Sequence, residues 1–328
     1  MGFLSGLTSW LNSPPPITEM ERRFIGRAVE TIDPMIKTIS GYERKLAPAV
    51  RYALDYCESL TAAVPGPIDI NFKAFSADPL VHAFFATPGD IGFMFGKSQE
   101  LRDYIASSTN ILADVFYALL GMRRREKSVM GMELHGDMIR SDVPQTVLYF
   151  ADHVLREFAD SPDETRRLLH RSAFESLVRG FSDKVMCMHQ HRQQLRNDRD
   201  MARTQMGKNT EGLLGAGSDS HAQRREEIEM QLRQVAESLS PENILKDLSA
   251  WLAEPEPHLR IDPITVSVDQ MGVLTDPSPD NPQVHTLNFP ELIGRDRRHW
   301  ILMIARIPKD EVLRAIDNQE QSSRYMII

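Results

Sequence analysis

Residues 25–60 read IGRAVETIDPMIKTISGYERKLAPAVRYALDYCESL, and this stretch decides the fold. Its apolar residues recur in alternating steps of four and three, the spacing of a helix face that packs lengthwise on another helix. The series, called the seam below, is Ile25, Val29, Ile32, Ile36, Ile39, Glu43, Leu46, Val50, Ala53, Cys57 and Leu60, with Glu43 as the one polar member. The seam predicts long helices that pack on one another.

Two prolines, Pro34 and Pro48, interrupt the seam. A proline inside a helix removes one backbone hydrogen bond and clashes with the preceding turn, at a cost of about 3 kcal/mol. Because the spacing stays in phase past both prolines, we expect either one kinked helix or several collinear segments. In the second arrangement, Asp33 caps a segment that begins at Pro34.

The composition is that of a soluble globular protein. The chain has 328 residues, 41% of them hydrophobic and 26% charged, enough for about two domains. No run of about 18 apolar residues occurs, so we expect no membrane-spanning helix. Cys57 lies on the seam, which predicts a buried thiol in a reducing compartment. The first dozen residues lack a basic region and a cleavage site, and we therefore expect a cytoplasmic protein.

Residues 1–16 form a short apolar arm that Pro14–Pro16 separate from the seam. Such an arm either docks on protein or lies in a membrane interface. No Lys or Arg lies opposite its apolar face, which favours docking on protein and leaves peripheral membrane contact through residues 1–12 as the alternative. The residues predicted to make the contact are Phe3, Leu4, Leu7, Trp10 and Leu11.

Residues 17–127 are predicted to form a helical core. The pairs Asp78-Pro79 and Thr87-Pro88 each supply a cap followed by proline at the first helical position. Residues 110–122 read NILADVFYALLGM and predict an apolar helix packed on the seam. The cations that follow suit the negative end of a helix dipole. They are Arg123, Arg124, Arg125 and Lys127.

Residues 128–160 are predicted to form a β-hairpin and a connection. The pattern changes to period two on both sides of His135-Gly136-Asp137, and glycine at the first central position suits a type II′ turn. Val143-Pro144 then lies at a bulge or on an edge strand, since proline cannot donate to a central ladder.

Two segments of the chain, one before this region and one within it, resemble those of an uncharacterised proteobacterial protein family of similar length. They read ADPLVHAFFATP at 77–88 and DVPQTVLYFADH at 142–153. The resemblance implies no activity, cofactor or catalytic residue.

Residues 161–253 predict a coiled-coil-like helical hairpin. Ser161-Pro162 begins a helix that runs to about Gly207, and the glycines of 212–221 mark the turn before a second helix. The apolar stripe of 174–188 should be buried on the body, whereas the part beyond Arg192 should project as an arm. The residues predicted to make interactions there are Leu195, Ile228, Leu232 and Val235.

Residues 254–328 are predicted to form a small antiparallel meander of about four strands. The strands ITVSV, VLT, VHTLNF and WILMIARI are separated by turn residues, and a short helix at Lys309–Asp317 follows. The predicted fold is thus α+β and mainly α.

Two groups of residues are weak candidates for metal binding, and neither defines a site. Cys187 and His191 are four apart on one helix face and suit a soft metal, but a second helix or a second copy must supply the other ligands. His135, Asp137, Asp152 and His153 are hard-metal ligand types near the predicted hairpin, although strand alternation points Asp152 and His153 to opposite faces. We therefore expect no cofactor.

The sequence favours a non-catalytic scaffold or adaptor that binds a protein partner or itself as a homo-oligomer. Its seams are longer than a compact domain needs, and no catalytic motif occurs. The first alternative is a metal-dependent hydrolase that uses His135, Asp137, Asp152 and His153. The second is a nucleic-acid-associated protein that uses Arg123–Lys127 and the arginines of 192–203. A net charge of -8 does not exclude it, because such a protein needs only a basic face, but the helix-end interpretation of Arg123–Lys127 makes it the less expected.

Overall fold

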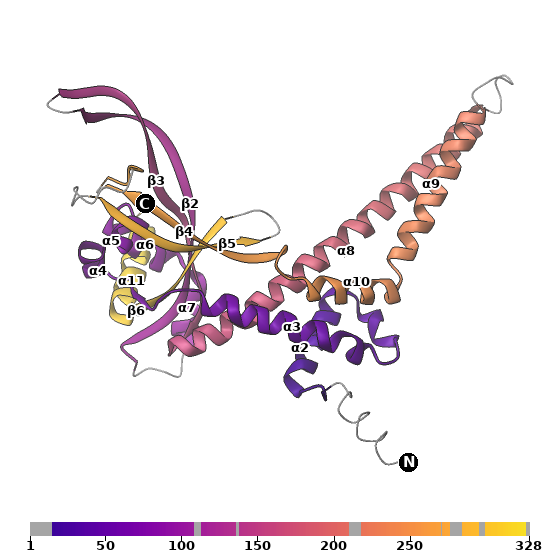
Figure 1. The fold of residues 1–328 in the computed structure, drawn as a ribbon, viewed down its shortest axis with the longest axis horizontal. Coiled ribbons are helices and arrows are strands. Elements are labelled where there is room, and N and C mark those ends of the chain that lie inside the picture. Colours follow the sequence, from indigo (N-terminus) through magenta and orange to yellow (C-terminus); the bar gives the residue numbers. More distant parts are fainter. Residues whose placement is uncertain are drawn as a thin grey trace, which may run out of the picture. The chain divides into compact units, whose positions relative to one another are not determined.

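The computed structural model describes residues 15–107, 113–135, 138–209, 218–269, 271–275, 284–294 and 299–325. It has an α+β fold with long helices and one six-stranded sheet (Figure 1). The chain divides into two compact units, each built from two distant stretches. The helical unit comprises Met1–Tyr56 and Phe174–Pro255, and the sheet unit comprises Cys57–Ala173 and Glu256–Ile328.

Among the described residues, six helical elements contribute to the helical unit, and two of them also include residues assigned to the sheet unit. These elements are α2 (Glu19–Ile32), the 3₁₀ helix η1 (Pro34–Thr38), α3 (Tyr42–Ala62), α8 (Pro162–Asn209), α9 (Ser218–Ser238) and α10 (Pro241–Ala253).

The two prolines of the seam have different effects. At Pro34 the helix stops: Asp33 is extended, and its side chain accepts a hydrogen bond of 2.9 Å from the Met35 N–H, which confirms it as the cap of a new segment. Pro48 instead lies inside α3, which continues to Ala62. The seam is therefore divided into separate segments and is not one helix.

Seam residues form much of the core of the helical unit. Ile25, Val29, Ile36, Leu46 and Val50 are fully buried. The predicted stripe on α8 is buried as far as Val185, and Met188 is half-buried. The ring centroids of Phe174 and Phe24 lie 4.9 Å apart, and those of Phe181 and Trp251 lie 5.7 Å apart. The Trp251 indole N–H donates to the Leu177 carbonyl at 3.0 Å, so the polar group of this packed ring has a hydrogen-bond partner.

Glu21 is a buried carboxylate at the start of α2. It closes a capping box with Thr18 and accepts a hydrogen bond of 2.6 Å from the Arg51 guanidinium on α3. That hydrogen bond, together with those from Thr18, outweighs burial and holds the pKa of Glu21 below its ordinary value of 4.5.

We expect Glu21→Gln to destabilise the protein at pH 7 by about 1.5–3 kcal/mol, the range for a hydrogen bond to a charged group. Because the folded-state pKa is lowered, the carboxylate's contribution is present above the unfolded pKa near 4.5 and is lost as the pH falls through the lower folded value. Urea unfolding between neutral pH and pH 3 should therefore show a smaller loss of stability for Glu21→Gln than for the wild type. Parallel curves for the two proteins would contradict this account.

The sheet unit contains the sheet and the shorter helices. The strand order is β3-β2-β6-β5-β4, antiparallel throughout, and β1 adds to β6 in parallel. Its elements are β1 (Ile68–Asp69), α4 (Phe72–Ala77), α5 (Pro79–Phe84), α6 (Pro88–Lys97), α7 (Gln99–Ser107), β2 (Val115–His135), β3 (Met138–Ala159), β4 (Leu259–Val268), β5 (His285–Gly294), β6 (His299–Pro308) and α11 (Lys309–Tyr325).

The predicted helix at 110–122 is wrong, because its described part from Val115 onward belongs to β2. Phe116 and Leu120 face one hydrophobic cluster while Leu119 faces another, so the strand is buried on both faces and shows no alternation. The predicted helix end at Arg123–Lys127 is wrong for the same reason, since these residues are paired with β3 in the middle of β2.

The predicted β-hairpin is confirmed and is longer than expected. β2 and β3 pair from Tyr117↔Ala159 to His135↔Met138. Pro144 lies on β3, which is an edge strand, as its missing N–H requires. Gly136 and Asp137 lie outside the described residues, so the turn type remains a prediction.

The predicted C-terminal meander is not a separate sheet, because β6 pairs with β2 along Val115–Met122. Of its four expected strands, VLT at 273–275 forms only isolated bridges. Val273 bridges to Val147 on β3, and Leu274 bridges to Val268 on β4. Val273 and Leu274 therefore bridge to the two outermost strands of the sheet.

Three bulges interrupt β3. Each coincides with a shift in the pairing with β2, and each contains an acidic residue at positive φ: Asp142 at 62°, Asp152 at 56° and Glu157 at 52°. A bulge adds one residue to its strand, so side-chain alternation on β3 changes phase three times. The side chain of Glu157 accepts a hydrogen bond from the Ser172 hydroxyl of α8, which gives this carboxylate a structural role.

Two hydrophobic clusters cover the faces of the sheet. One joins the sheet to α5, α6, α7 and α11 through residues such as Phe84, Phe95, Leu101 and Val312. On the other, Val64 and Leu169 pack on Leu119, Leu302 and Ile304.

Arg166 of α8 binds three backbone carbonyls beside the second cluster. Its guanidinium donates to the carbonyls of Thr61 and Val64 at 2.9 Å and of Gly66 at 3.4 Å. A planar cation with several donors suits the unpaired carbonyls that follow the end of α3.

Among the described residues, no helix combines the length and hydropathy of a membrane span.

Candidate functional site

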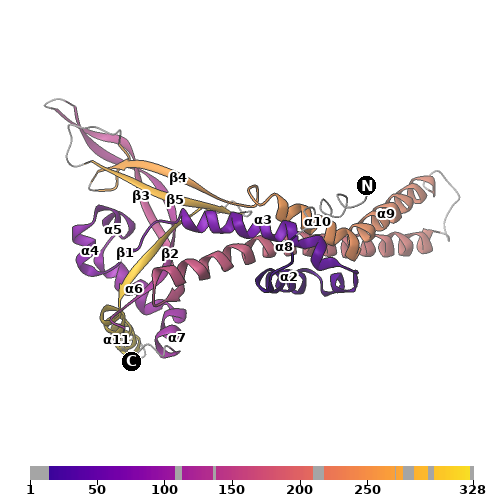
Figure 2. The same ribbon diagram turned by 60° about the horizontal axis from the view of Figure 1, so that its bottom comes forward.

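Among the described residues of the helical unit, the distal part of α8 and α9 is largely exposed. We call it the arm and define it as residues 189–204 and 223–238. The two helices lie side by side and antiparallel in both views (Figure 1, Figure 2). Among these described residues, Leu195 on α8 and Ile228 on α9 are the only ones fully buried, at 5% and 7% exposure. Both line one open surface hollow of about 450 Å³, which places them on facing sides of the two helices.

The predicted interaction residues of the arm hold the two helices together. Leu195 and Ile228 are buried, and Leu232 and Val235 are half-buried in line with them. The large apolar side chains that remain exposed among the described residues of the arm are Met201 at 57% and Met230 at 65%. The sequence pattern therefore identified the residues that lie between the two helices of the arm. The exposed apolar side chains of the arm are the two methionines. The N-terminal candidates Phe3, Leu4, Leu7, Trp10 and Leu11 lie outside the described residues.

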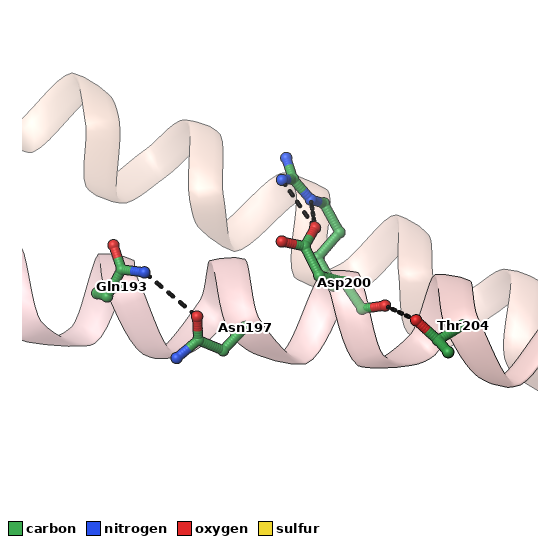
Figure 3. Close-up of polar contacts among 5 residues, drawn as sticks. Gln193, Asn197, Asp200 and Thr204 are labelled. Carbon is green, nitrogen blue, oxygen red and sulfur yellow. Dashed lines mark hydrogen bonds and ion pairs between the residues drawn. The ribbon is translucent and has the colours of Figure 1, made fainter.

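One side of α8 in the arm carries polar residues in steps of four, three and four. Figure 3 shows this row, which consists of Gln193, Asn197, Asp200 and Thr204. The Gln193 amide donates to Asn197 Oδ1 at 3.2 Å, and the Thr204 hydroxyl donates to the Asp200 carbonyl at 2.9 Å. These bonds run along one helix and leave further donors and acceptors facing solvent.

The Cys187–His191 pair remains two exposed side chains on one helix. Its neighbour His189 lies 3.2 Å from an Arg192 nitrogen. Cys57, by contrast, is the predicted buried thiol, and burial raises its pKa to about 12. Among the described residues, no three His, Cys, Asp or Glu side chains come close enough together to hold a metal ion.

The second metal candidate is divided by a bulge of β3. The Asp152 carboxylate lies 3.6 Å from both Arg123 and Arg125. His153 instead contacts the Phe84 carbonyl through Nε2 at 2.7 Å and stacks on Phe85, and burial lowers its pKa. The structure thus commits Asp152 and His153 to different partners, as their expected placement on opposite faces implies. The His135 side chain and Asp137 lie outside the described residues.

A groove of about 710 Å³ in the sheet unit was not predicted from the sequence. It lies between α4–α5 and β3, and core residues including Phe85, Leu148 and Phe150 form its floor. Its acidic residues are already engaged: Asp78 caps α5, and Asp269 accepts the N–H groups of Met271 and Val273. The groove joins residues about 200 positions apart, so no local pattern could reveal it.

A charged cluster on the sheet was also missed. Glu291 is 3% exposed and lies 3.3 Å from the Arg124 Nε and 3.0 Å from His299 Nδ1. The three residues come from β5, β2 and β6, which are brought together only by the sheet order. Since a buried carboxylate needs a charged partner, the cluster accounts for Arg124, which was expected at a helix end.

Comparisons of the chain with protein-family models, curated proteins and solved structures found no match.

Proposed function

We propose that this protein is a non-catalytic scaffold that brings copies of itself together through the arm. The proposal is supported by one observation above all: each helix of the arm has a single fully buried residue among those described. Two much shorter helices would be enough to bury Leu195 and Ile228. The remaining surface is available for contact with another molecule.

The exposed methionines supply the apolar contacts. Met201 and Met230 lie on different helices of the same arm, and Met186 on α8 is 54% exposed. Methionine is unbranched and polarizable, so it adapts to the surface of a partner helix and is common in protein-binding faces. The hydrolase alternative gains no support from the described residues, because the side chains of Asp152 and His153 have other partners.

We expect deletion of 190–234, with the helices rejoined by a short Gly-Ser turn, to convert a self-associating protein into a folded monomer. The deletion removes two fully buried residues among those described, so the core of the helical unit is retained. Sedimentation velocity over a range of concentrations measures the association, and circular dichroism checks the fold. An unchanged association state after the deletion would remove the assembly role from the arm.

A pair of substitutions tests the same idea without deletion. Met201→Glu with Met230→Glu should weaken association at least about tenfold, because each places a charge in an apolar contact. The matched control is Met20→Glu with Met271→Glu, since these methionines are 56% and 82% exposed and lie outside the arm. Equal effects of the two pairs would point to net charge as the cause and would count against the arm.

A further inference from the structure

Four arginines follow one side of α8 in the arm. They are Arg192, Arg196, Arg199 and Arg203, in steps of four, three and four, which keeps them on one side of a helix. At 1.5 Å per residue, the row is about 16 Å long. We call it the arginine row.

The arginine row lies apart from the exposed methionine of the same helix. With 3.6 residues per turn, Arg196 and Arg203 lie about 80–100° around α8 from the buried Leu195. Met201 lies about 120° from Leu195 in the opposite sense. The arm can therefore use the methionine for protein contact and the arginine row for a different partner.

Two of the arginines have no described acidic partner. Arg196 and Arg203 are exposed, and neither forms an ion pair with another described side chain. Arg199 binds Asp200 Oδ1 at 3.1 and 3.0 Å, and Arg192 contacts His189 at 3.2 Å. The segment thus has an excess of positive charge, in a chain whose net charge is -8.

The polar row beside the arginines lacks free carboxylates. Gln193, Asn197 and Thr204 carry amide and hydroxyl groups, and the one acidic member, Asp200, is the partner of Arg199 (Figure 3). Asparagine, glutamine and threonine are the uncharged residues that accompany arginine in contacts with phosphate and sugar oxygens. An acidic protein partner would not require this combination.

We propose that the arginine row, with the polar row beside it, binds the phosphate backbone of a nucleic acid without reading its sequence. Arginine presents a planar fork of donors that matches phosphate geometry. A DNA strand places one phosphate about every 3.4 Å along the axis, so a row of about 16 Å faces about five of them. The arginines lie away from Met201, whereas the polar row borders it, since Asn197, Asp200 and Thr204 line one surface hollow with Met201.

The test is the salt dependence of binding of the full-length protein to a fluorescent duplex of about 20 base pairs, with salt varied between about 50 and 200 mM. Up to four phosphate contacts give a slope of log K against log salt of about -3.6. Arg196→Gln with Arg203→Gln removes two contacts, so the slope should fall to about -1.8, with affinity at the lowest salt at least about tenfold weaker.

The matched control is Arg23→Gln with Arg167→Gln. It removes the same charge from arginines that are 76% and 72% exposed and lie outside the arm. Retention of the steep slope by this control, and its loss from the arm variant, supports the proposal. Absence of binding at the lowest salt, or equal effects of the two pairs, would overturn it. Binding of polyglutamate in place of the duplex would also overturn it and assign the row to an acidic protein.

Discussion

Ile36→Asp is expected to unfold the helical unit. Ile36 is fully buried in η1, which packs on α2 and α10, so an aspartate at this position would place a carboxylate in an apolar core. An unpaired charge at such a position costs several kcal/mol, comparable with the whole stability of a typical domain, about 5–15 kcal/mol. Ile32→Asp should have a smaller effect, because Ile32 is only half-buried.

The neighbouring residue supplies the control. Met35 is 57% exposed in the same short helix, so Met35→Asp adds the same charge without burying it. Thermal melting followed by circular dichroism should show a lost or strongly lowered transition for Ile36→Asp and a nearly normal one for Met35→Asp. A normal, cooperative melt of Ile36→Asp would mean that the seam is not core.

Gly66→Ala should destabilise the sheet unit by about 3 kcal/mol or more, since it combines backbone strain with an overpacked contact. Gly66 has φ +116°, a conformation that residues with a Cβ rarely adopt. A methyl group there would also lie 2.3 Å from the Ile304 carbonyl oxygen, well inside van der Waals contact. Neither atom can move freely, because Ile304 N–H donates to Pro65 O at 2.9 Å and Ile304 belongs to β6.

Gly92→Ala is the matched control for Gly66→Ala. Gly92 lies in α6 of the same unit, without positive φ, and a methyl group there would make an ordinary contact of 3.5 Å with Phe72. Alanine in place of a helical glycine should add about 0.5–1 kcal/mol of stability. Urea unfolding of both variants gives the two values, and similar stabilities would show that the close approach of Gly66 to β6 is not required.

Helix starts could be predicted from the sequence because each depends on a few adjacent residues. Asp78 and Ser161 each accept a hydrogen bond from the N–H of a residue in the helix that follows, and Thr87 forms a capping box with Asp90. The β-hairpin was found in the same way, from alternation on both sides of one glycine. The long helix at 162–209 was predicted from its cap and its apolar stripe.

The pairing of distant strands could not be predicted in this way. The first part of β2 reads as a helix because both of its faces are buried, and the strand that pairs with it, β6, lies nearly 200 residues later. The bulges of β3 concealed its alternation further. The same limit applies to the sites. The apolar spacing of the arm helices is a local pattern, so it could be found from the sequence. The groove and the Glu291 cluster depend on contacts between residues far apart in the chain, so they could not.

The division of the chain into interleaved units has a consequence for its synthesis on the ribosome. Residues 1–56 belong to a unit whose other half begins about 120 residues later, at Phe174. At about 5–20 residues per second, the first half waits roughly 6–24 s for its partner to emerge. Throughout that interval the apolar seam of α2 and α3 has no complete core to enter. We therefore expect chaperones to bind the nascent chain during this interval. Slower translation between residues 56 and 174 should prolong that binding.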